Sequence, residues 1–175
     1  GKFMMIALPN PDKTFTATVF LPFMGEQGFD QLQSDDLVIQ FFEQYFSDAL
    51  PLMPELLDEW NDHPTGHLYT VKCNPWHMDN KVLLLGDAAH AIIPFYGQGM
   101  NCGFEDVTEL NEILDATNEN WQEALNKFQH QRKPNADAIA DLALYNFIEM
   151  RDLSGREDFQ LRLKLEKKIA EKFQD

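Results

Sequence analysis

The residues best suited to chemistry lie between Lys81 and Asn101, where the sequence reads KVLLLGDAAHAIIPFYGQGMN. The apolar run Val82–Leu85 is typical of a buried strand in a parallel sheet. It ends at Gly86 and Asp87, where a small residue lets backbone approach a ligand and a carboxylate can accept hydrogen bonds from hydroxyl groups. A glycine-containing loop then leads to a helix that we expect to begin near Asn101. This order of elements predicts a place that holds a polar cofactor.

The loop and the helix start supply groups that suit a flat, anionic ring system. Gly97 and Gly99 would let the loop lie close against such rings. A helix that begins near Met100–Asn101 offers unpaired N–H groups and the positive end of a dipole. Each residue also has a purely structural explanation, because Asp87 could cap a turn and glycines are common after strands. The occurrence of all these residues in this order is therefore more informative than any one of them alone.

Other catalytic patterns are absent from the sequence. Gly97, Gly99 and Gly103 are spaced G-x-G-x-x-x-G, and the dinucleotide fingerprint G-x-G-x-x-G occurs nowhere in the chain. His90 could act in acid–base chemistry, but its place directly after two alanines favours a structural role with donation to backbone. No Ser/His/Asp triad and no metal-ligand spacing is present. We therefore assign no catalytic residue and no metal ligand.

Composition limits the class of protein. The 175 residues are enough for one ordinary domain with a core. The net charge is −15, from 14 basic and 29 acidic residues. Seven acids and no base lie between Asn101 and Ala124, which argues against nucleic acid as a partner and against a nicotinamide dinucleotide docking there. Cys73 and Cys102 have no paired spacing and are predicted to be free thiols.

The elements that would position these residues follow from periodicity and turn signals. Strands are predicted over Phe3–Leu8, Thr14–Phe20, His67–Cys73 and Val82–Leu85, with a loop over Asn74–Asn80. Helices are predicted from Ser34 or Asp35 through Phe46, and over Leu50–Trp60, Asn101–Asn118, Trp121–Gln131, Ala136–Arg151 and Phe159–Phe173. Pro134 is expected to separate two of these helices.

Two helices carry a further prediction. The helix after Asn101 should bury an apolar stripe made of Phe104, Val107, Leu110, Ile113 and Leu114. The last helix has apolar residues at fourfold spacing among mixed charges, namely Leu161, Leu165, Ile169 and Phe173. Such a narrow stripe could pack on a parent domain or lie on a membrane surface, and its acid content favours packing. No apolar run approaches the roughly 18 residues that a bilayer span needs.

Three tracts resemble the kynurenine 3-monooxygenase branch of the FAD-dependent aromatic hydroxylases. They are GDAAHAIIPFYGQGMNCGFED, FMMIALPNPDKTFTATVFLPF and LALYNFIEMRD. The resemblance implies an α/β fold that is part of the hydroxylase fold, with a substrate-side mixed β-sheet, a strand and helix that complete the FAD domain, and C-terminal helices. It implies that residues 1–75 belong to a substrate-binding domain, 76–131 to an FAD-binding domain and 132–175 to a C-terminal helical segment.

The same resemblance implies a function. FAD, NADPH and O2 would be used to hydroxylate the aromatic ring of L-kynurenine to 3-hydroxykynurenine, in tryptophan catabolism and NAD biosynthesis. The family's nucleotide fingerprint lies in an N-terminal half that this chain lacks, so we expect the chain to need that half as a partner and to be inactive alone. The implied location is the cytosolic face of the mitochondrial outer membrane, with membrane contact only through a region outside this chain.

The resemblance also implies the site residues. Those matching FAD contacts are Gly86, Asp87, Gly97, Gly99, Met100 and Asn101. Those matching the substrate pocket are Phe20, Pro94, Phe95, Gln98, Asn146 and Met150, while the role of Tyr96 stays open. Two alternatives remain at this point: another FAD-dependent hydroxylase or epoxidase, or a non-catalytic flavoprotein-derived module that binds partners through Phe159–Phe173.

Overall fold

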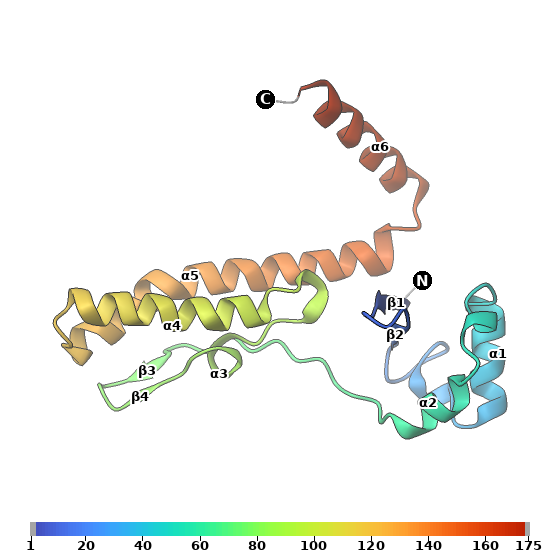
Figure 1. Cartoon of the computed structure of the whole chain (residues 1–175), viewed down its shortest axis with the longest axis horizontal. Coiled ribbons are helices and arrows are strands. Elements are labelled where there is room, and N and C mark those ends of the chain that lie inside the picture. The colour runs from blue at the N-terminus through green and yellow to red at the C-terminus, as the bar shows by residue number, and fades with distance from the viewer. Residues whose placement is uncertain (1–2, 174–175) are drawn as a thin grey trace. The chain divides into compact units, whose positions relative to one another are not determined.

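The computed structural model describes residues 3–173, and the chain divides into two units that are described separately (Figure 1). One unit comprises Gly1–Gly66 together with Met150–Asp175, and the other comprises His67–Glu149. Helices predominate and the sheets are small. The predicted α/β class is confirmed in this mixed form.

The first unit begins with the predicted hairpin. β1 (Met4–Pro9) pairs antiparallel with β2 (Phe15–Phe20), with Met4 opposite Phe20 and Pro9 opposite Phe15. The turn between them is fixed by Asp12, whose carboxylate accepts hydrogen bonds from both the N–H and the hydroxyl of Thr14. The strand pair is thereby confirmed.

A small aromatic core follows the hairpin. After a 3-10 turn, η1 (Phe29–Gln31), α1 (Asp35–Tyr45) buries Val38, Phe41 and Phe42 against Leu56 of α2 (Leu56–Asp62). The single helix predicted over Leu50–Trp60 is wrong in part, because a 3-10 turn, η2 (Leu50–Leu52), precedes α2. The break falls at Met53, since the residue before a proline is disfavoured in helical geometry.

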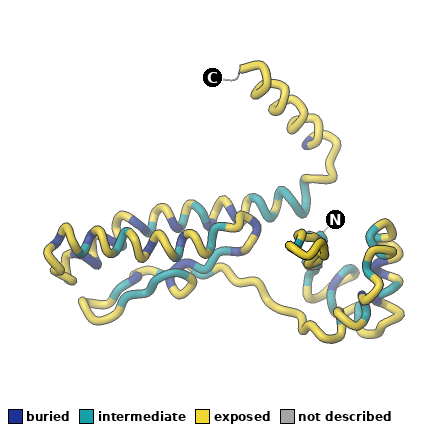
Figure 2. Tube along the Cα trace, viewed as in Figure 1, coloured by how far each residue is buried: buried dark blue, intermediate teal, exposed yellow. Residues whose placement is uncertain are grey.

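The last helix, α6 (Glu157–Lys172), confirms the prediction for this segment. Phe159 is buried, whereas the apolar stripe Leu161, Leu165, Ile169 and Phe173 is exposed. Most of α6 is exposed (Figure 2). Within residues 3–173, no helix combines the length and the apolar character needed to cross a membrane.

The second unit is built on two long helices, α4 (Gly99–Ala116) and α5 (Trp121–Ile148), which pack along each other (Figure 1). Before them come a short hairpin of β3 (His77–Met78) and β4 (Val82–Leu83), the helix α3 (Asp87–His90) and a 3-10 turn, η3 (Pro94–Tyr96). A π-helical turn, η4 (Glu149–Leu153), follows α5, and the chain passes into the first unit within it.

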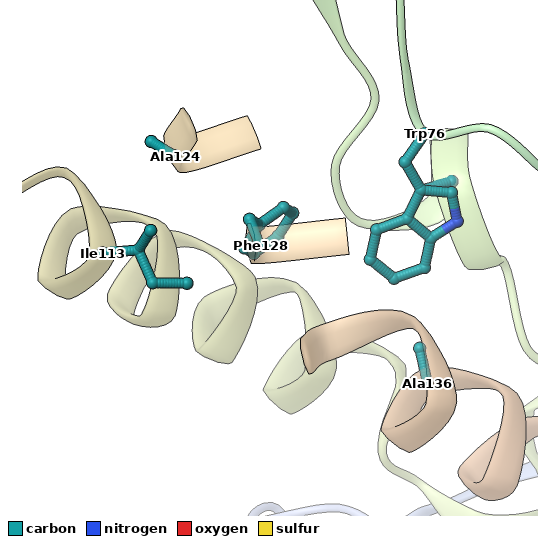
Figure 3. Close-up of a cluster of buried hydrophobic side chains, with 6 residues drawn as sticks. Trp76, Ile113, Ala124, Phe128 and Ala136 are labelled. Carbon is teal, nitrogen blue, oxygen red and sulfur yellow. The ribbon is translucent and has the colours of Figure 1, made fainter. Parts of the chain in front are cut away.

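The core of this unit lies between the hairpin, α3 and the two long helices. It consists of Trp76, Ala89, Ile113, Ala124, Phe128 and Ala136 (Figure 3). The Trp76 ring lies with its centroid 5.9 Å from that of Phe128 and 5.1 Å from that of His90. Small alanines on α3 and α5 let these large rings pack closely between the elements.

The parallel strand predicted over Val82–Leu85 is wrong. β4 covers only Val82–Leu83 and pairs antiparallel with β3, which lies inside the segment predicted as a loop over Asn74–Asn80. The strand predicted over His67–Cys73 is also wrong, since Val71 and Cys73 donate their N–H groups to the carbonyls of Ala91 and Ala89 instead. A sheet needs neighbouring strands, and residues 3–173 offer these segments no further strand to pair with.

The helix break predicted at Pro134 is also wrong, because α5 runs through this proline without interruption. A proline inside a helix removes one backbone hydrogen bond and costs about 3 kcal/mol. The helix has buried residues on both sides of this proline, which form one continuous face against the rest of the unit. They are Phe128 and Arg132 before it and Ala136 and Ala140 after it. Tertiary packing therefore outweighs the local preference.

The stripe predicted for α4 is half right. Ile113 is buried and Leu110 and Leu114 pack against the core, but Phe104 and Val107 are exposed. The inner face instead carries Cys102, Asp106 and Thr117. An apolar-periodicity argument misses this face because its central member is a carboxylate.

Asp106 is fully buried and joins four parts of the unit. Its Oδ2 accepts hydrogen bonds from the Gly86 N–H at 2.8 Å and from His90 Nε2 at 2.6 Å. Its Oδ1 accepts from Arg132 Nε at 2.8 Å. Arg132, itself buried, also donates to the Cys102 carbonyl at 3.0 Å. The turn before α3, α3 itself, α4 and α5 thus meet at one carboxylate.

The ionisation of this cluster follows from its partners. Burial of Asp106 favours the neutral acid, but the hydrogen bonds from His90, Arg132 and Gly86 outweigh burial and hold the pKa of Asp106 below its ordinary value. Burial alone would lower the pKa of Arg132, yet the hydrogen bond to Asp106 and the charges of Asp106, Glu109 and Glu105 raise it. Both groups are therefore charged at neutral pH.

We expect the Asp106 carboxylate to make stability depend on acid pH. Because its pKa is lower in the folded than in the unfolded state, its contribution is present above about pH 4 and is lost as pH falls through the folded pKa. Asp106→Asn should cost about 3 kcal/mol or more at pH 7, since it leaves Arg132 buried without its main partner. Urea unfolding followed by circular dichroism at pH 3–7 measures both effects.

The matched control is Glu105→Gln, which removes a largely exposed partner of the same arginine. It should change the unfolding free energy by about 1 kcal/mol or less. An Asp106→Asn variant as stable as this control would contradict the assigned role of the buried carboxylate.

Replacing Pro134 should stabilise α5. Pro134→Ala restores a helical N–H and removes a steric conflict, while it also frees the unfolded chain, so a net gain of about 1–2 kcal/mol is expected. Gln131→Ala, an exposed neighbour on the same helix, should change stability by about 0.5 kcal/mol or less. A loss of stability in Pro134→Ala would show that the proline serves the packing of α5.

Candidate functional site

The acidic turn is held in a conformation that favours glycine. Gly86 has φ 54° and ψ −139°, in the left-handed half of backbone space, and it occupies the N-cap position of α3. Asp87 is the first residue of α3 and is exposed. Its carboxylate therefore projects from a turn that only a glycine enters without strain.

This turn lies against α4. A Cβ built on Gly103 would be 3.8 Å from the Gly86 Cα, and the Gly86 N–H donates to Asp106 one turn further along the helix. Gly103 is in turn one helical turn from the start of α4 at Gly99. The structure thus places the turn that precedes Asp87 against the second turn of α4.

The helix start is built as expected, two residues earlier than predicted. α4 begins at Gly99 after Gln98 as its N-cap, and the first internal bond runs from the Cys102 N–H to the Gln98 carbonyl. The N–H groups of the first turn, at Gly99, Met100 and Asn101, have no partner within the helix. The Asn101 side chain donates to Gln98 Oε1 at 2.8 Å. Hydrogen-bond donors and exposed amides therefore gather at this terminus.

The loop before α4 is fixed to α5. Gly97 closes η3 in the left-handed conformation, with φ 67°. The Asn146 amide donates a hydrogen bond to the Phe95 carbonyl, and the rings of Phe95 and Phe147 lie with centroids 4.7 Å apart. The Phe95 side chain is buried and Pro94 is exposed. Asn146 therefore positions the loop and keeps its carbonyl oxygen for another partner.

An open depression of about 190 Å³ lies beside the start of α4. It is lined by Gln98, Asn101, Cys102, Glu105, Arg132, Asn135 and Ile139. Typical small-molecule pockets measure about 300–1,000 Å³, so this depression is smaller than a typical ligand site. It places two of the predicted residues, Gln98 and Asn101, on one concave surface.

Phe20 and Met150 belong to the other unit. Phe20 ends β2 and Met150 lies in η4, and both are half-buried. Their assignment to a substrate pocket stays a prediction, as does the FAD-contacting role of the other residues.

Asp106 and Arg132 are the site-supporting residues that sequence reasoning missed. The structural role predicted for His90 fits its buried position, but its partner is the Asp106 carboxylate and not backbone. One signal was available: Asp106 follows Gly103 by three residues in a helix, so an acid and a glycine lie on the same face. Within residues 3–173, no group of three or more His, Cys, Asp or Glu side chains could hold a metal ion.

Known proteins resemble this chain along its whole length. The kynurenine 3-monooxygenase of Flavobacterium johnsoniae is 47% identical over 100% of the chain and 39% of that protein. Those of Cytophaga hutchinsonii and Dictyostelium discoideum are 51% and 48% identical, over 99% of the chain and 39% and 40% of the relative. The chain therefore spans about two fifths of the length of these relatives.

The chain also matches a known protein family. Residues 29–143 match the family described as FAD binding domain, which includes Gly86, Asp87 and the start of α4. Because this match covers well over half of the 175 residues, the chain belongs to the FAD binding domain family.

Proposed function

We propose that this chain is part of a flavoprotein monooxygenase that hydroxylates L-kynurenine to 3-hydroxykynurenine with FAD, NADPH and O2. The observation that carries the proposal is the placement of the Gly86–Asp87 turn against α4, whose start offers unpaired N–H groups. The similarity to proteins named kynurenine 3-monooxygenase supports the choice of substrate.

The residues present fit a flavin. The exposed Asp87 carboxylate would accept hydrogen bonds from the hydroxyls of the ribityl chain. The first turn of α4 would face the pyrimidine edge of the ring, where negative charge collects on reduction, and the helix terminus stabilises such charge. Gly97 and Gly99 leave no side chain between the loop and the rings. Bound FAD would supply the oxidising chemistry, while these residues bind and orient it.

The substrate end of the site would be formed by the loop over residues 94–98. Pro94, Phe95 and Gln98 come from this loop, and Asn146 would offer its free carbonyl oxygen to the amino group of the amino-acid end of L-kynurenine. The resemblance that assigns Phe20 and Met150 to substrate contact is retained as part of this proposal. The protein mainly positions the ring and excludes water, because the amino group of the substrate itself activates the ring.

The domain division, the N-terminal partner and the location implied by the resemblance also belong to this proposal. The division into residues 1–75, 76–131 and 132–175 refers to domains of the assembled enzyme. The N-terminal half of the enzyme would complete the FAD site, and the chain would be inactive without it. The cytosolic face of the mitochondrial outer membrane is the location proposed for a eukaryotic form, with membrane contact through a region outside this chain.

Asp87→Ala should weaken FAD binding about tenfold to a hundredfold. The lost hydrogen bonds join an ionised group to hydroxyls, and such bonds contribute about 1.5–3 kcal/mol. Flavin fluorescence titration of the FAD-free full-length enzyme measures the change. Glu112→Ala removes an exposed carboxylate from α4 without touching the turn, and its affinity should match the wild type. Equal affinities for the two variants would remove Asp87 from the cofactor site.

Asn146→Ala should raise the Kd for L-kynurenine about tenfold or more, since a hydrogen bond to a charged ligand contributes about 1.5 kcal/mol or more. The control is Asn126→Ala, because Asn126 is also an α5 amide that donates to a backbone carbonyl, at 2.7 Å from Gln122 O. Substrate titration and steady-state turnover of the full-length enzyme are the measurements. Values within about twofold of wild type would refute the substrate assignment.

The alternatives are separated by two simple measurements. Another FAD-dependent hydroxylase or epoxidase would oxidise NADPH with a different member of a substrate panel. An interaction module would show no flavin absorbance even with the N-terminal half supplied, and the exposed apolar stripe of α6 is the feature that favours this reading.

A further inference from the structure

The helix α3 is too short to hold its own orientation. It has four residues, and its internal bonds are donated to the Gly86 carbonyl by the N–H groups of Ala89 and His90, both at 2.9 Å. Helices shorter than about 12 residues are marginal by themselves, so the direction of α3 is set by contacts outside it. This direction matters because Asp87, the proposed partner of the ribityl chain, is its first residue.

Both ends of α3 bind the same oxygen atom of α4. Asp106 Oδ2 accepts the Gly86 N–H at 2.8 Å, at the start of the helix, and His90 Nε2 at 2.6 Å, at its end. One contact alone would let α3 pivot on the surface of α4, whereas two contacts fix its direction there. Because the ionised Asp106 only accepts, Nε2 carries the proton of the imidazole. Asp87 lies between the two contacts, and its own side chain is exposed.

The charge of Asp106 does not depend on His90 alone. The carboxylate also accepts from the N–H of Gly86 and from Nε of Arg132. What His90 adds is a side-chain link between the end of α3 and α4. The imidazole is 2% exposed, and its ring centroid lies 5.1 Å from that of the buried Trp76, so this link has little freedom to move.

We propose that His90 is a positioning residue for the cofactor. Its hydrogen bond to Asp106 sets the direction of α3 on α4, and thereby the direction in which the Asp87 carboxylate is presented. His90 touches no ligand in this assignment and acts only through Asp87. The inference rests on the proposed function, because it takes Asp87 to bind the hydroxyls of FAD. It adds to that function a residue that determines cofactor affinity from inside the core.

The first test measures the affinity of the FAD-free full-length enzyme for FAD by flavin fluorescence titration. His90→Leu removes the donor and keeps a buried apolar group, so it should weaken binding about fivefold or more. His90→Gln supplies an N–H donor of similar reach and should bind within about twofold of wild type. The matched control is His130→Leu at an exposed histidine of α5, which should bind as the wild type does. Unchanged affinity in His90→Leu, or a loss that His90→Gln shares, would overturn the proposal.

A double variant shows whether His90 acts through Asp87. In the Asp87→Ala background, His90→Leu should change FAD affinity by about twofold or less, because the group that it positions is gone. The same loss in both backgrounds would overturn the proposal. Wild-type FAD affinity in Asp87→Ala itself would instead refute the cofactor site of the proposed function. FAD binding without kynurenine turnover would count against the proposed substrate alone.

The last test needs no cofactor. Amide hydrogen exchange with mass spectrometry compares two peptides of the FAD-free full-length protein, one over residues 84–91 and one around Phe128. In His90→Leu the first peptide should exchange about fivefold faster or more than in wild type and His90→Gln, while the second keeps its wild-type rate. Equal acceleration of both peptides would assign His90 to the stability of the whole unit and overturn the proposal. So would failure of either His90 variant to fold.

Discussion

The second unit depends on one buried carboxylate. Asp106 accepts hydrogen bonds from a backbone N–H, a histidine and an arginine, and these three donors come from three different elements. Its partners outweigh the cost of burial, so it stays ionised and lies at the point where α3, α4 and α5 meet. A buried charge that is fully hydrogen-bonded tolerates little displacement, because any lost partner leaves an unsatisfied group in a low-dielectric interior. The relative placement of these elements is therefore set by polar contacts as much as by the apolar core around Trp76 and Phe128.

This constraint reaches the candidate cofactor site directly. The N–H that binds Asp106 belongs to Gly86, and the next residue is Asp87. The turn that presents the Asp87 carboxylate is thus attached to the core before any ligand arrives. On the other side, Asn146 and Phe147 of α5 hold the Phe95 loop that leads into α4. The Gly86 turn is therefore held by α4 and the Phe95 loop by α5, and the predicted flavin contacts lie on these two segments. Such preorganisation reduces the conformational entropy that binding would otherwise cost.

The sequence predicted the parts of this arrangement that depend on local chemistry. The β1–β2 hairpin, α1 and the start of α4 follow from turn residues, helical periodicity and glycine spacing. The errors arise where distant residues decide. Pro134 is carried through α5 because Arg132 and Ala136 are held by contacts outside their own helix. Asp106 and Arg132 escaped notice because periodicity arguments assign charged residues to the solvent side, and only a structure shows that these two satisfy each other inside the unit.

One kind of error carries information of its own. Val82–Leu85 was predicted to be buried from its apolar run, and Phe104 and Val107 from their helical spacing, but Val82, Phe104 and Val107 are exposed. On α4 the side that faces α5 carries Asp106 and Ile113, whereas Phe104 and Val107 on the opposite side are exposed, so helical periodicity alone does not distinguish the two faces.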